Sequence, residues 1–375
     1  MKKLVFLVML CFVAVNAYAD KPLQFIVSED ISYDDNIYLT DGNKTSSAIS
    51  STQLFAKYLN TVPNSSLKFG ANANIGYNAY SEAPAKNDYM NAGLGVNLSN
   101  SKFFLEDKFV YTADPATSEL SDRAKRINNF ASFRFKTSLE RMFSIALIAS
   151  DSLDRYQEAE YEALNRNRFN AGAQLHYNVS SKTSIYAGYL FSAINYEKNK
   201  NNNSFGNSFN LGVNGNVTQK IKGTAQVSYD MRDYDTDIAG MEKKGELFGY
   251  LVSLAYEPTT KNSVKLFGER KMEETITVNN RYYVSTEVGL EYKQKVYNDK
   301  WSVALLTSYE NLSYPEKIGD VDRADDLFKV KPSVEYKFRE NLFASLWYQF
   351  RNKSSNYDGA EYTNNKVGVQ VKFTF

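Results

Sequence analysis

Few side chains in this sequence could do chemistry. The 375 residues include one histidine, His176, and one cysteine, Cys11. A thiolate or imidazole metal site needs several such ligands, and a cysteine nucleophile needs a histidine beside it. The composition therefore predicts no disulfide framework, no thiolate metal centre and no cysteine–histidine catalysis. We expect no cofactor and no catalytic residue.

Two acidic clusters are candidate calcium sites, and a calcium ion needs about six to eight oxygen ligands. Asp233, Asp235 and Asp237 begin with the spacing of a calcium-binding loop. However, Ile238 and Lys244 stand where that loop needs a glycine and a closing glutamate. The second cluster, which lacks the spacing, comprises Asp320, Asp322, Asp325 and Asp326. We predict no metal site and interpret both clusters as solvated surface.

The overall charge gives no reason to expect a nucleic acid as partner. Lys and Arg number 44 against 43 Asp and Glu, so the chain is nearly neutral. A nucleic-acid-binding domain is usually strongly basic, at least on one face. The mean hydropathy of -0.46 is that of a polar chain, yet 14% of the residues are aromatic. This combination favours a β-protein.

The first nineteen residues have the pattern of a secretory signal peptide. Lys2 and Lys3 precede an apolar run, 4–15, and Ala17-Tyr18-Ala19 fits the small-residue cleavage site. Twelve apolar residues are too few to span a bilayer, which argues against an anchor helix. We predict a signal peptide at 1–19 and a mature domain at 20–375. Cys11 lies in the signal peptide, so the mature chain has no cysteine.

Apolar and polar residues alternate along most of the mature chain. All twelve positions from Ile221 to Arg232 obey a period of two, which only an extended strand with one apolar face can use. No later stretch approaches eighteen uncharged apolar residues, which excludes an α-helical membrane protein. Such runs predict about eighteen strands, with sixteen as the alternative: 23–33, 47–60, 65–80, 88–99, 102–112, 124–137, 141–151, 165–178, 182–194, 205–217, 220–232, 244–257, 262–272, 280–293, 300–312, 325–338, 341–352 and 362–375.

The connections between these strands alternate in length. Short ones, such as 100–101, 179–181 and 218–219, separate longer ones, such as 113–123, 152–164 and 233–243. Bacterial outer-membrane barrels have short periplasmic turns and longer outer loops, whereas a soluble sandwich has no reason to alternate in this way. We therefore predict an all-β fold, a transmembrane antiparallel β-barrel. No connection is long enough to predict a large inward-folded constriction loop or plug.

Aromatic residues and the chain terminus support a membrane barrel. Aromatic residues stand near the ends of the apolar faces, as Trp301 and Tyr309 do, where two interfacial girdles would need them. The last strand ends in an alternation of apolar residues that resembles the C-terminal signal read by the outer-membrane assembly machinery. That signal comprises Val367, Val369, Val371, Phe373 and Phe375. We expect the mature protein in the outer membrane of a Gram-negative-type bacterium, after cleavage near Ala19.

The segment Tyr33-Asp34-Asp35-Asn36-Ile37-Tyr38-Leu39-Thr40 resembles the Asp-Asp-Asn start of the second putative beta-barrel porin family. Members of that family are similar in length and share the C-terminal alternation. The resemblance implies an outer-membrane barrel, and some members are associated with exopolysaccharide export. Read from the residues alone, Asp34-Asp35-Asn36 is more simply the start of a turn than a binding site.

The predicted lumen faces carry more basic than acidic groups in the C-terminal half. The basic positions are Lys220, Lys222, Arg232, Lys265, Lys271, Arg281, Lys293, Lys300, Lys329, Lys331, Lys337, Arg351, Lys366 and Lys372. The acidic positions are Asp230, Glu257, Glu269, Glu287, Glu291, Glu310, Asp325 and Glu335. A confined pore with walls of one sign favours ions of the opposite sign. We therefore predict a mild preference for anions, although charges that only keep the lumen wet would give the same list.

Three functions remain for such a barrel. A passive channel for hydrophilic solutes fits sixteen to eighteen strands, which leave an aqueous lumen. The alternatives are the outer-membrane pore of an exopolysaccharide export system and a structural or adhesive barrel with a blocked lumen. An enzyme is the weakest reading, because His176 is expected near a periplasmic turn as a solvated lumen residue. Expected partners are outer-membrane lipid, lipopolysaccharide (also through weak divalent bridging), the assembly machinery, and polysaccharide or export components.

Overall fold

The computed structural model describes residues 23–375, with gaps at 63–64, 116, 120–122, 278–279 and 298. Eighteen strands form one antiparallel sheet in which each strand pairs with its sequence neighbours. β1 also pairs with β18, from Ile26 opposite Thr374 to Asp34 opposite Lys366, and this ladder closes the barrel. The strands are β1 (Leu23–Asp34), β2 (Ser47–Thr61), β3 (Lys68–Tyr80), β4 (Tyr89–Ser99), β5 (Phe103–Thr112), β6 (Arg126–Ser138), β7 (Phe143–Tyr156), β8 (Arg166–Ser180), β9 (Thr183–Tyr196), β10 (Ser204–Asn216), β11 (Ile221–Tyr234), β12 (Lys244–Thr259), β13 (Asn262–Glu274), β14 (Tyr282–Val296), β15 (Trp301–Ser313), β16 (Ala324–Arg339), β17 (Leu342–Ser355) and β18 (Tyr362–Thr374).

The predicted all-β barrel is confirmed, with eighteen strands rather than sixteen. Predicted and observed strand ends differ by at most five residues, and the largest difference is at β7, which continues to Tyr156. β7 extends because Asp154, expected in a loop, lies between two arginines of the neighbouring strands: Arg126 Nη1 at 3.4 Å and Arg166 Nε at 3.6 Å. The predicted signal peptide and its cleavage site lie outside the described residues.

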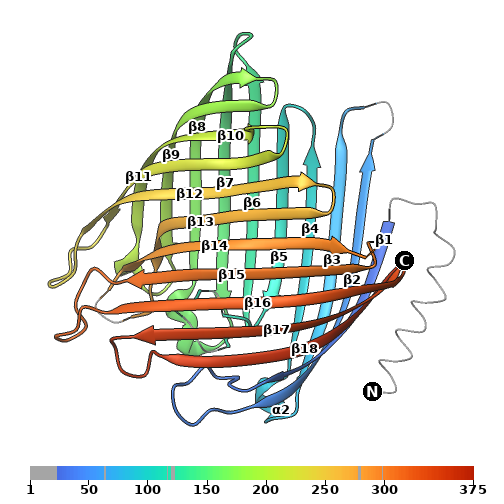
Figure 1. The fold of residues 1–375 in the computed structure, drawn as a ribbon. Helices are drawn as coiled ribbons and strands as arrows, with labels where there is room; N and C mark the ends of the chain where they lie inside the picture. The colour runs from blue at the N-terminus through green and yellow to red at the C-terminus, as the bar shows by residue number, and fades with distance from the viewer. Residues whose placement is uncertain (1–22, 63–64, 116, 120–122, 278–279, 298) are drawn as a thin grey trace.

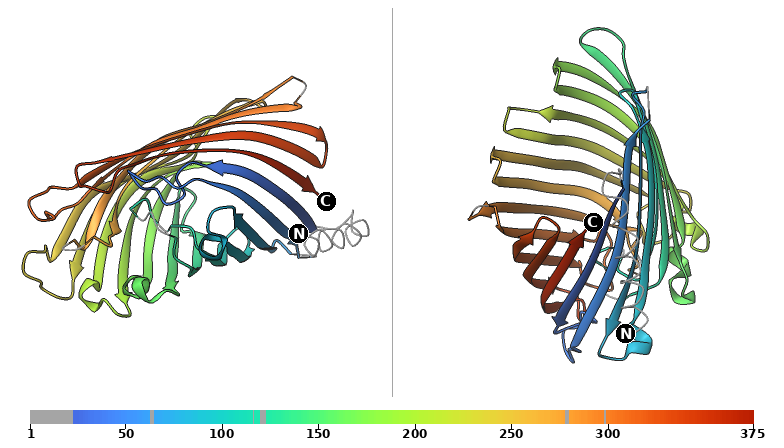
Figure 2. Two further views of the ribbon diagram at one scale, coloured as in Figure 1. Left: turned by 90° about the horizontal axis from the view of Figure 1, so that it is seen from below. Right: turned by 90° about the vertical axis from the view of Figure 1, so that its right-hand side faces the viewer.

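Two walls of strands face each other, and the strands of one wall cross those of the other (Figure 1). β12–β18 run across the front of the view, whereas β2–β7 run from bottom to top behind them. This crossing is expected when the strands of a barrel tilt by about 35–45° from its axis. Two further views show the C-terminal end of β18 beside β1 (Figure 2), in agreement with their ladder.

The connections differ at the two ends of the barrel. Eight turns of two to six residues lie at the end that also holds the start of β1 and the end of β18. Nine connections of six to thirteen residues lie at the opposite end. Outer-membrane barrels place the short turns in the periplasm and the longer loops outside, so we call these the periplasmic end and the outer end.

The alternation of residue types separates a lipid face from a lumen face. On β11 the outward Val227 is 58% exposed, and on β12 the outward Phe248 is 77% exposed. The residues that alternate with these outward positions along each strand, such as Gln226 and Ser228 on β11, face the lumen. A barrel in water would bury such a belt, but lipid solvates it. Aromatic pairs lie on this belt near the periplasmic end, including Trp301 with Tyr336, whose ring centroids are 4.6 Å apart.

In the part of the chain that the structure describes, helical structure is confined to three short segments of the outer connections: α2 (Pro84–Asn87), η1 (Ala159–Leu164) and η2 (Lys200–Asn202). None of the helices in the described ranges is long and apolar enough to cross a membrane. Buried apolar residues instead gather inside the barrel toward its outer end, where connections and strand ends meet. One such cluster holds Ile37, Ile49, Tyr80, Tyr89 and Ala113.

Candidate functional site in the lumen

The barrel wall opens between β12 and β13 toward the outer end. Their ladder ends where Tyr250 stands opposite Arg270. Beyond that point β12 pairs only with β11, and β13 pairs only with β14. The outer end of the β13–β14 hairpin is therefore free to leave the wall.

This hairpin end lies inside the barrel. Nearer the periplasmic end, the face of the hairpin that carries Met272 and Tyr282 points outward to lipid. At the outer end these two residues instead pack with Tyr234 and Leu247 in a buried cluster. Leu247 points to the lumen. Gly245 permits the approach, because a Cβ there would lie 3.1 Å from the Tyr282 ring. The outward face of the hairpin thus rests on the lumen face of β11 and β12.

Glu274, the last residue of β13, ties the hairpin to the facing strands. Its side chain is 3% exposed, and its Oε1 accepts a hydrogen bond from Arg232 Nη1 at 3.0 Å. Its Oε2 accepts from Arg168 and lies 3.6 Å from Arg166 Nη2. Arg232 projects into the lumen from β11, and the other two project from β8. A buried carboxylate with three cations is held firmly, because losing the contact would leave an uncompensated buried charge.

The connection between β5 and β6, residues 113–125, contacts the described end of the hairpin through Glu119. Glu119 in this connection is buried and accepts hydrogen bonds from Thr275 Oγ1 at 2.5 Å and Ile276 N at 3.0 Å. It also accepts from the Tyr314 hydroxyl at 3.2 Å. Burial raises the pKa of Tyr314, so its hydroxyl stays protonated and donates.

No large constriction loop or plug was predicted from the lengths of the connections, yet the structure narrows the lumen from within. A thirteen-residue connection and the end of one strand hairpin together narrow the lumen. Length alone gave no sign of this, because neither segment is unusually long. The visible signal is Glu274, a carboxylate at a position that the alternation assigns to lipid.

A cavity of about 590 Å³ remains beside this constriction. Its wall comes from the lumen faces of β1–β4 and β13–β18 and from the described residues of the 113–125 connection. Six acidic and six basic residues line it, so its net charge is close to zero. The acidic residues are Asp34, Asp114, Glu269, Glu273, Glu287 and Glu310, and the basic residues are Arg123, Lys271, Lys329, Lys331, Arg351 and Lys366.

The charges of this cavity are separated in space. Four of the acids lie on β13–β15, whereas four of the bases lie on β16–β18. Lys271 is paired with Glu269 at 2.7 Å and with Glu273 at 2.8 Å. Among the described residues Lys331 and Arg351 have no ion pair, so their charge is available to a solute. Neighbouring parts of the same wall therefore carry opposite charge, and such a field orients a charged solute in the lumen.

A second cavity of about 800 Å³ opens toward the periplasmic turns. Lys331 lines both cavities and marks the place where they adjoin. Its ammonium lies 4.6 Å from the centre of the Trp347 ring, whose Nε1 donates to Asp30 Oδ2 at 2.7 Å. Next to Lys331 is Pro332, and the β16–β17 ladder is interrupted there because proline has no backbone N–H to donate.

The fourteen basic residues predicted for the lumen fall into three groups. Lys271, Lys329, Lys331, Arg351 and Lys366 line the central cavity, and Lys293 lines the second one. Lys222, Arg232, Lys265, Lys337 and Lys372 share the lumen face elsewhere, where all but Lys265 form ion pairs. Lys220 and Lys300 lie in periplasmic turns, and Arg281 lies buried at the end of the 275–281 connection, donating to Thr236 O at 2.7 Å.

Sequence reasoning did not identify the N-terminal part of this site. Asp34, Asp114 and Arg123 belong to the cavity but lie at or beyond strand ends, where alternation says nothing about direction. A cation–π contact holds Arg123 in place, because its guanidinium carbon lies 4.4 Å from the centre of the Tyr80 ring. Glu273 was also missed, because the predicted strand ended at residue 272.

The Asp34-Asp35-Asn36 motif forms a tight turn that is bound to β18. Asn36 is fully buried, and its Nδ2 donates to Thr40 O at 2.7 Å and to Thr363 O at 3.0 Å. Asn364 Nδ2 donates to Asp34 Oδ1 at 2.6 Å. These bonds join the outer ends of the first and last strands, so the motif closes the barrel, in line with its interpretation as the start of a turn.

His176 and Asp325, a member of the second acidic cluster, are both buried. His176 is buried at the periplasmic end, with Nδ1 3.2 Å from Ser184 Oγ. Among the described residues no group of three or more His, Cys, Asp or Glu side chains could hold a metal ion. Asp325 departs from the expected solvated surface, because it is fully buried between Arg323 Nη2 at 2.7 Å and Lys353 Nζ at 3.0 Å.

Comparison with solved structures finds an outer-membrane protein of the same fold. The outer membrane protein opdK from Pseudomonas aeruginosa has a TM-score of 0.51 and 11% identity, covering 94% of this chain and 99% of its own. Pseudomonas aeruginosa OpdL has 0.49 and 12%, covering 96% and 99%. Acinetobacter baumannii OccAB4 has 0.47 and 12%, covering 95% and 99%. No curated protein matches the sequence.

Fold and lumen together define an outer-membrane β-barrel of the porin type. The family model described as Putative beta-barrel porin 2 matches residues 25–375. The chain therefore belongs to this family, as the sequence resemblance indicated. Membership indicates a non-enzymatic channel protein.

Proposed function

We propose that this barrel is a channel for the passive passage of hydrophilic solutes and that it favours anions. The observation that carries the proposal is the pair of adjoining lumen cavities, which meet at Lys331 between the constriction and the periplasmic turns. Both are lined by charged and polar side chains. Such a path suits small water-soluble solutes, whereas the inward hairpin limits their size.

The preference for anions rests on which charges are free rather than on the net charge. The central cavity holds equal numbers of acids and bases, so a simple count predicts no selectivity. However, Lys331 and Arg351 have no ion pair within the described ranges, and Lys366 Nζ is 4.0 Å from its nearest carboxylate, on Asp34. Unpaired cations at the junction of two cavities would select anions where the path is narrow.

The test is the reversal potential of the refolded mature chain, Asp20 to Phe375, in a planar bilayer across a KCl gradient. We expect steady openings and a reversal potential on the chloride side. The triple variant Lys331→Gln/Arg351→Gln/Lys366→Gln should move the reversal potential toward the equilibrium potential of potassium. The lipid-facing Val334→Ala should leave the reversal potential unchanged. A wild-type preference for potassium would contradict the anion part of the proposal.

Two alternatives make different predictions in the same experiment. A pore for exopolysaccharide export would conduct and would also let long acidic saccharides cross from the periplasmic to the outer side, and the unpaired cations favour this second candidate. A structural or adhesive barrel would fold and shift on heating in a gel, yet would never conduct. We further propose outer-membrane lipid, lipopolysaccharide and the assembly machinery as partners.

A further inference from the structure

A group of four cations occupies the periplasmic mouth on the side of β5–β7. Lys102 and Arg141 lie in the turns before β5 and β7, and Arg134 and Lys136 lie on β6. Lys136 N donates to Lys102 O at 2.6 Å, which joins β6 to the turn before β5. None of the four forms an ion pair with any described residue. We call this group the mouth cations.

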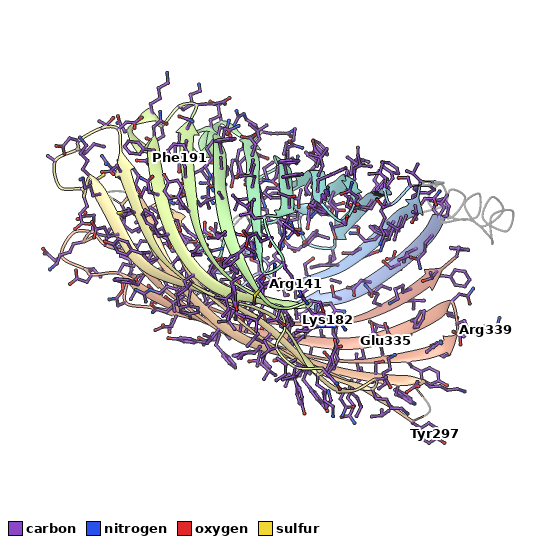
Figure 3. The ribbon with its side chains drawn as sticks, turned by 90° about the horizontal axis from the view of Figure 1, so that it is seen from above. Arg141, Lys182, Phe191, Tyr297, Glu335 and Arg339 are labelled. Atoms are coloured by element: carbon purple, nitrogen blue, oxygen red, sulfur yellow. The ribbon has the colours of Figure 1, made fainter. Side chains whose placement is uncertain are left out.

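The mouth cations of β6 face the lumen and not the lipid. Phe133 and Phe135 alternate with them on β6, and Phe133 is 41% exposed on the outward face. Arg134 and Lys136 therefore point inward. Arg141 stands in the neighbouring turn (Figure 3), and Ser181 of the next periplasmic turn lines the same depression.

Two depressions of the wall surround these residues, and neither contains an acidic side chain. The first, about 920 Å³, is lined by Lys102, Lys136 and Arg141 together with hydroxyl and amide groups. Its other polar residues are Ser101, Thr137, Ser138, Ser144, Asn178, Ser180 and Ser181. The second, about 490 Å³, lies further along the wall and includes the unpaired Arg134 together with Arg168, which is bound to Glu274. Unpaired cations beside hydroxyl groups suit a ligand that carries both carboxylates and hydroxyls.

The two ends of the barrel carry opposite charge. The nine outer connections contain 19 Asp and Glu against 10 Lys and Arg. In contrast, the eight periplasmic turns contain six Lys and Arg against three Asp and Glu, and each turn has an exposed basic residue within it or at the strand residue beside it. These residues are Lys68, Lys102, Arg141, Lys182, Lys220, Lys261, Lys300 and Arg339. Such an arrangement attracts an anion to the periplasmic mouth and repels it from the outer one.

We propose that the mouth cations form a binding site for acidic oligosaccharide that enters the lumen from the periplasm. The inference rests on the proposed channel function and specifies one class of solute and its direction. Carboxylates of the saccharide contact Lys102, Lys136 and Arg141 in the first depression and Arg134 in the second, and its hydroxyls contact the serine and asparagine side chains that line both. An anionic lipid headgroup is the competing ligand, but it cannot reach Arg134 through the wall.

The test uses current block by hexagalacturonate, with maltohexaose as the uncharged saccharide of equal length. Asn201→Cys, labelled with biotin in the outer 197–203 connection, reports through streptavidin which side is outer. In bilayers of uncharged lipid at 0.15 M KCl, we expect hexagalacturonate added from the periplasmic side to block at least about tenfold more often than from outside. At 1 M KCl, where the Debye length is about 3 Å, most of this difference should vanish.

The decisive variant is Arg134→Gln/Lys136→Gln, which keeps the size and polarity of both side chains. We expect it to lower the rate of block from the periplasmic side about tenfold. The matched control is Lys222→Gln/Lys337→Gln, which removes the same charge from the same end, but from cations already paired with Glu257 and Glu340. The control should change the rate little.

The outcomes separate this inference from the channel proposal. A barrel that conducts but is blocked equally from both sides, or equally in the two double variants, overturns the inference and leaves the channel intact. A barrel that never conducts overturns the channel proposal. In that case calorimetric titration of hexagalacturonate into detergent-solubilised barrel still tests the site. Weaker binding only in Arg134→Gln/Lys136→Gln supports it, and equal binding overturns it.

Discussion

Arg232 on β11 donates to Glu274 on β13 at 3.0 Å, across the space that opens where β12 and β13 separate. The alternation of β13 would turn Glu274 toward lipid, where a carboxylate is costly. The contact exists because the hairpin end has moved inside the wall. The pair therefore marks a structural constriction and does not simply add to a charged lumen.

Removing the charge of Glu274 should loosen this constriction. Glu274→Gln removes the carboxylate partner of Arg168 and Arg232 and leaves Arg166 with Asp154 alone, and breaking a buried ion pair costs roughly 3–5 kcal/mol. Because the strand ladders do not depend on it, the barrel should still fold. We expect a larger or less steady single-channel conductance. The control is Glu273→Gln, whose carboxylate faces the cavity, and equal conductance in both variants would contradict the constriction.

The acidic side of the central cavity should oppose the anion preference. Glu287 lines the cavity and has no ion pair within the described part of the chain. Glu287→Gln should move the reversal potential further to the chloride side, opposite to the effect of Lys331→Gln. Both shifts should shrink at 1 M KCl, where the Debye length is about 3 Å. Shifts of the same sign would rule out a field across the lumen.

The turn at Asn36 should contribute to the stability of the closed barrel. Asn36→Ala removes the donor to Thr363 O on β18 and leaves buried polar groups unpaired, at a cost of about 1–3 kcal/mol. We expect unfolding at lower urea concentration in a gel-shift assay of the refolded barrel. Asn201→Ala, in an exposed outer segment, serves as the control and should unfold like the wild type.

The C-terminal alternation should matter for assembly more than for the finished fold. Phe375 exchanges two backbone hydrogen bonds with Phe25, at 3.3 and 2.9 Å, and these do not need its ring. Phe375→Ala should therefore fold into detergent or lipid at nearly the wild-type rate. With purified assembly machinery its insertion should slow, unlike that of Thr374→Ala. Equal rates with the machinery would mean that the terminal ring is not recognised.

The strands were predictable because each obeys a period of two over ten or more residues. A one-residue slip would turn a whole face such as Val367, Val369 and Val371 from lipid to lumen, so register and boundaries are strongly specified. The alternating lengths of the connections likewise placed both termini at one end. Local pattern is sufficient for these features.

The constriction was not predictable from the same pattern. Whether the β13–β14 hairpin stays in the wall depends on contacts between distant segments, such as Glu274 with Arg168 and Thr275 with Glu119. Alternation assigns a side chain to one of two faces but does not show that a strand has left the sheet. A charged residue on the lipid face, as at Glu274, is the one local sign of it.

The candidate site was predictable only in part for a related reason. The alternation of side chains along each strand placed Lys331, Arg351 and Lys366 in the lumen, where they line the central cavity. Counting charges along strands could not show which of them are neutralised by a partner. Nor did it include the cations at 134 and 136, since only the C-terminal half was counted.

Chemical modification at Lys331 tests whether ions cross the barrel through the two cavities, because this residue lines both of them. The mature chain has no cysteine, so Lys331→Cys carries the only thiol. A bulky thiol reagent that attaches to it should abolish most of the current, while the lipid-facing Val334→Cys, labelled to the same extent, should keep it. If complete labelling of Lys331→Cys leaves the current unchanged, ions do not cross by this path and the account is wrong.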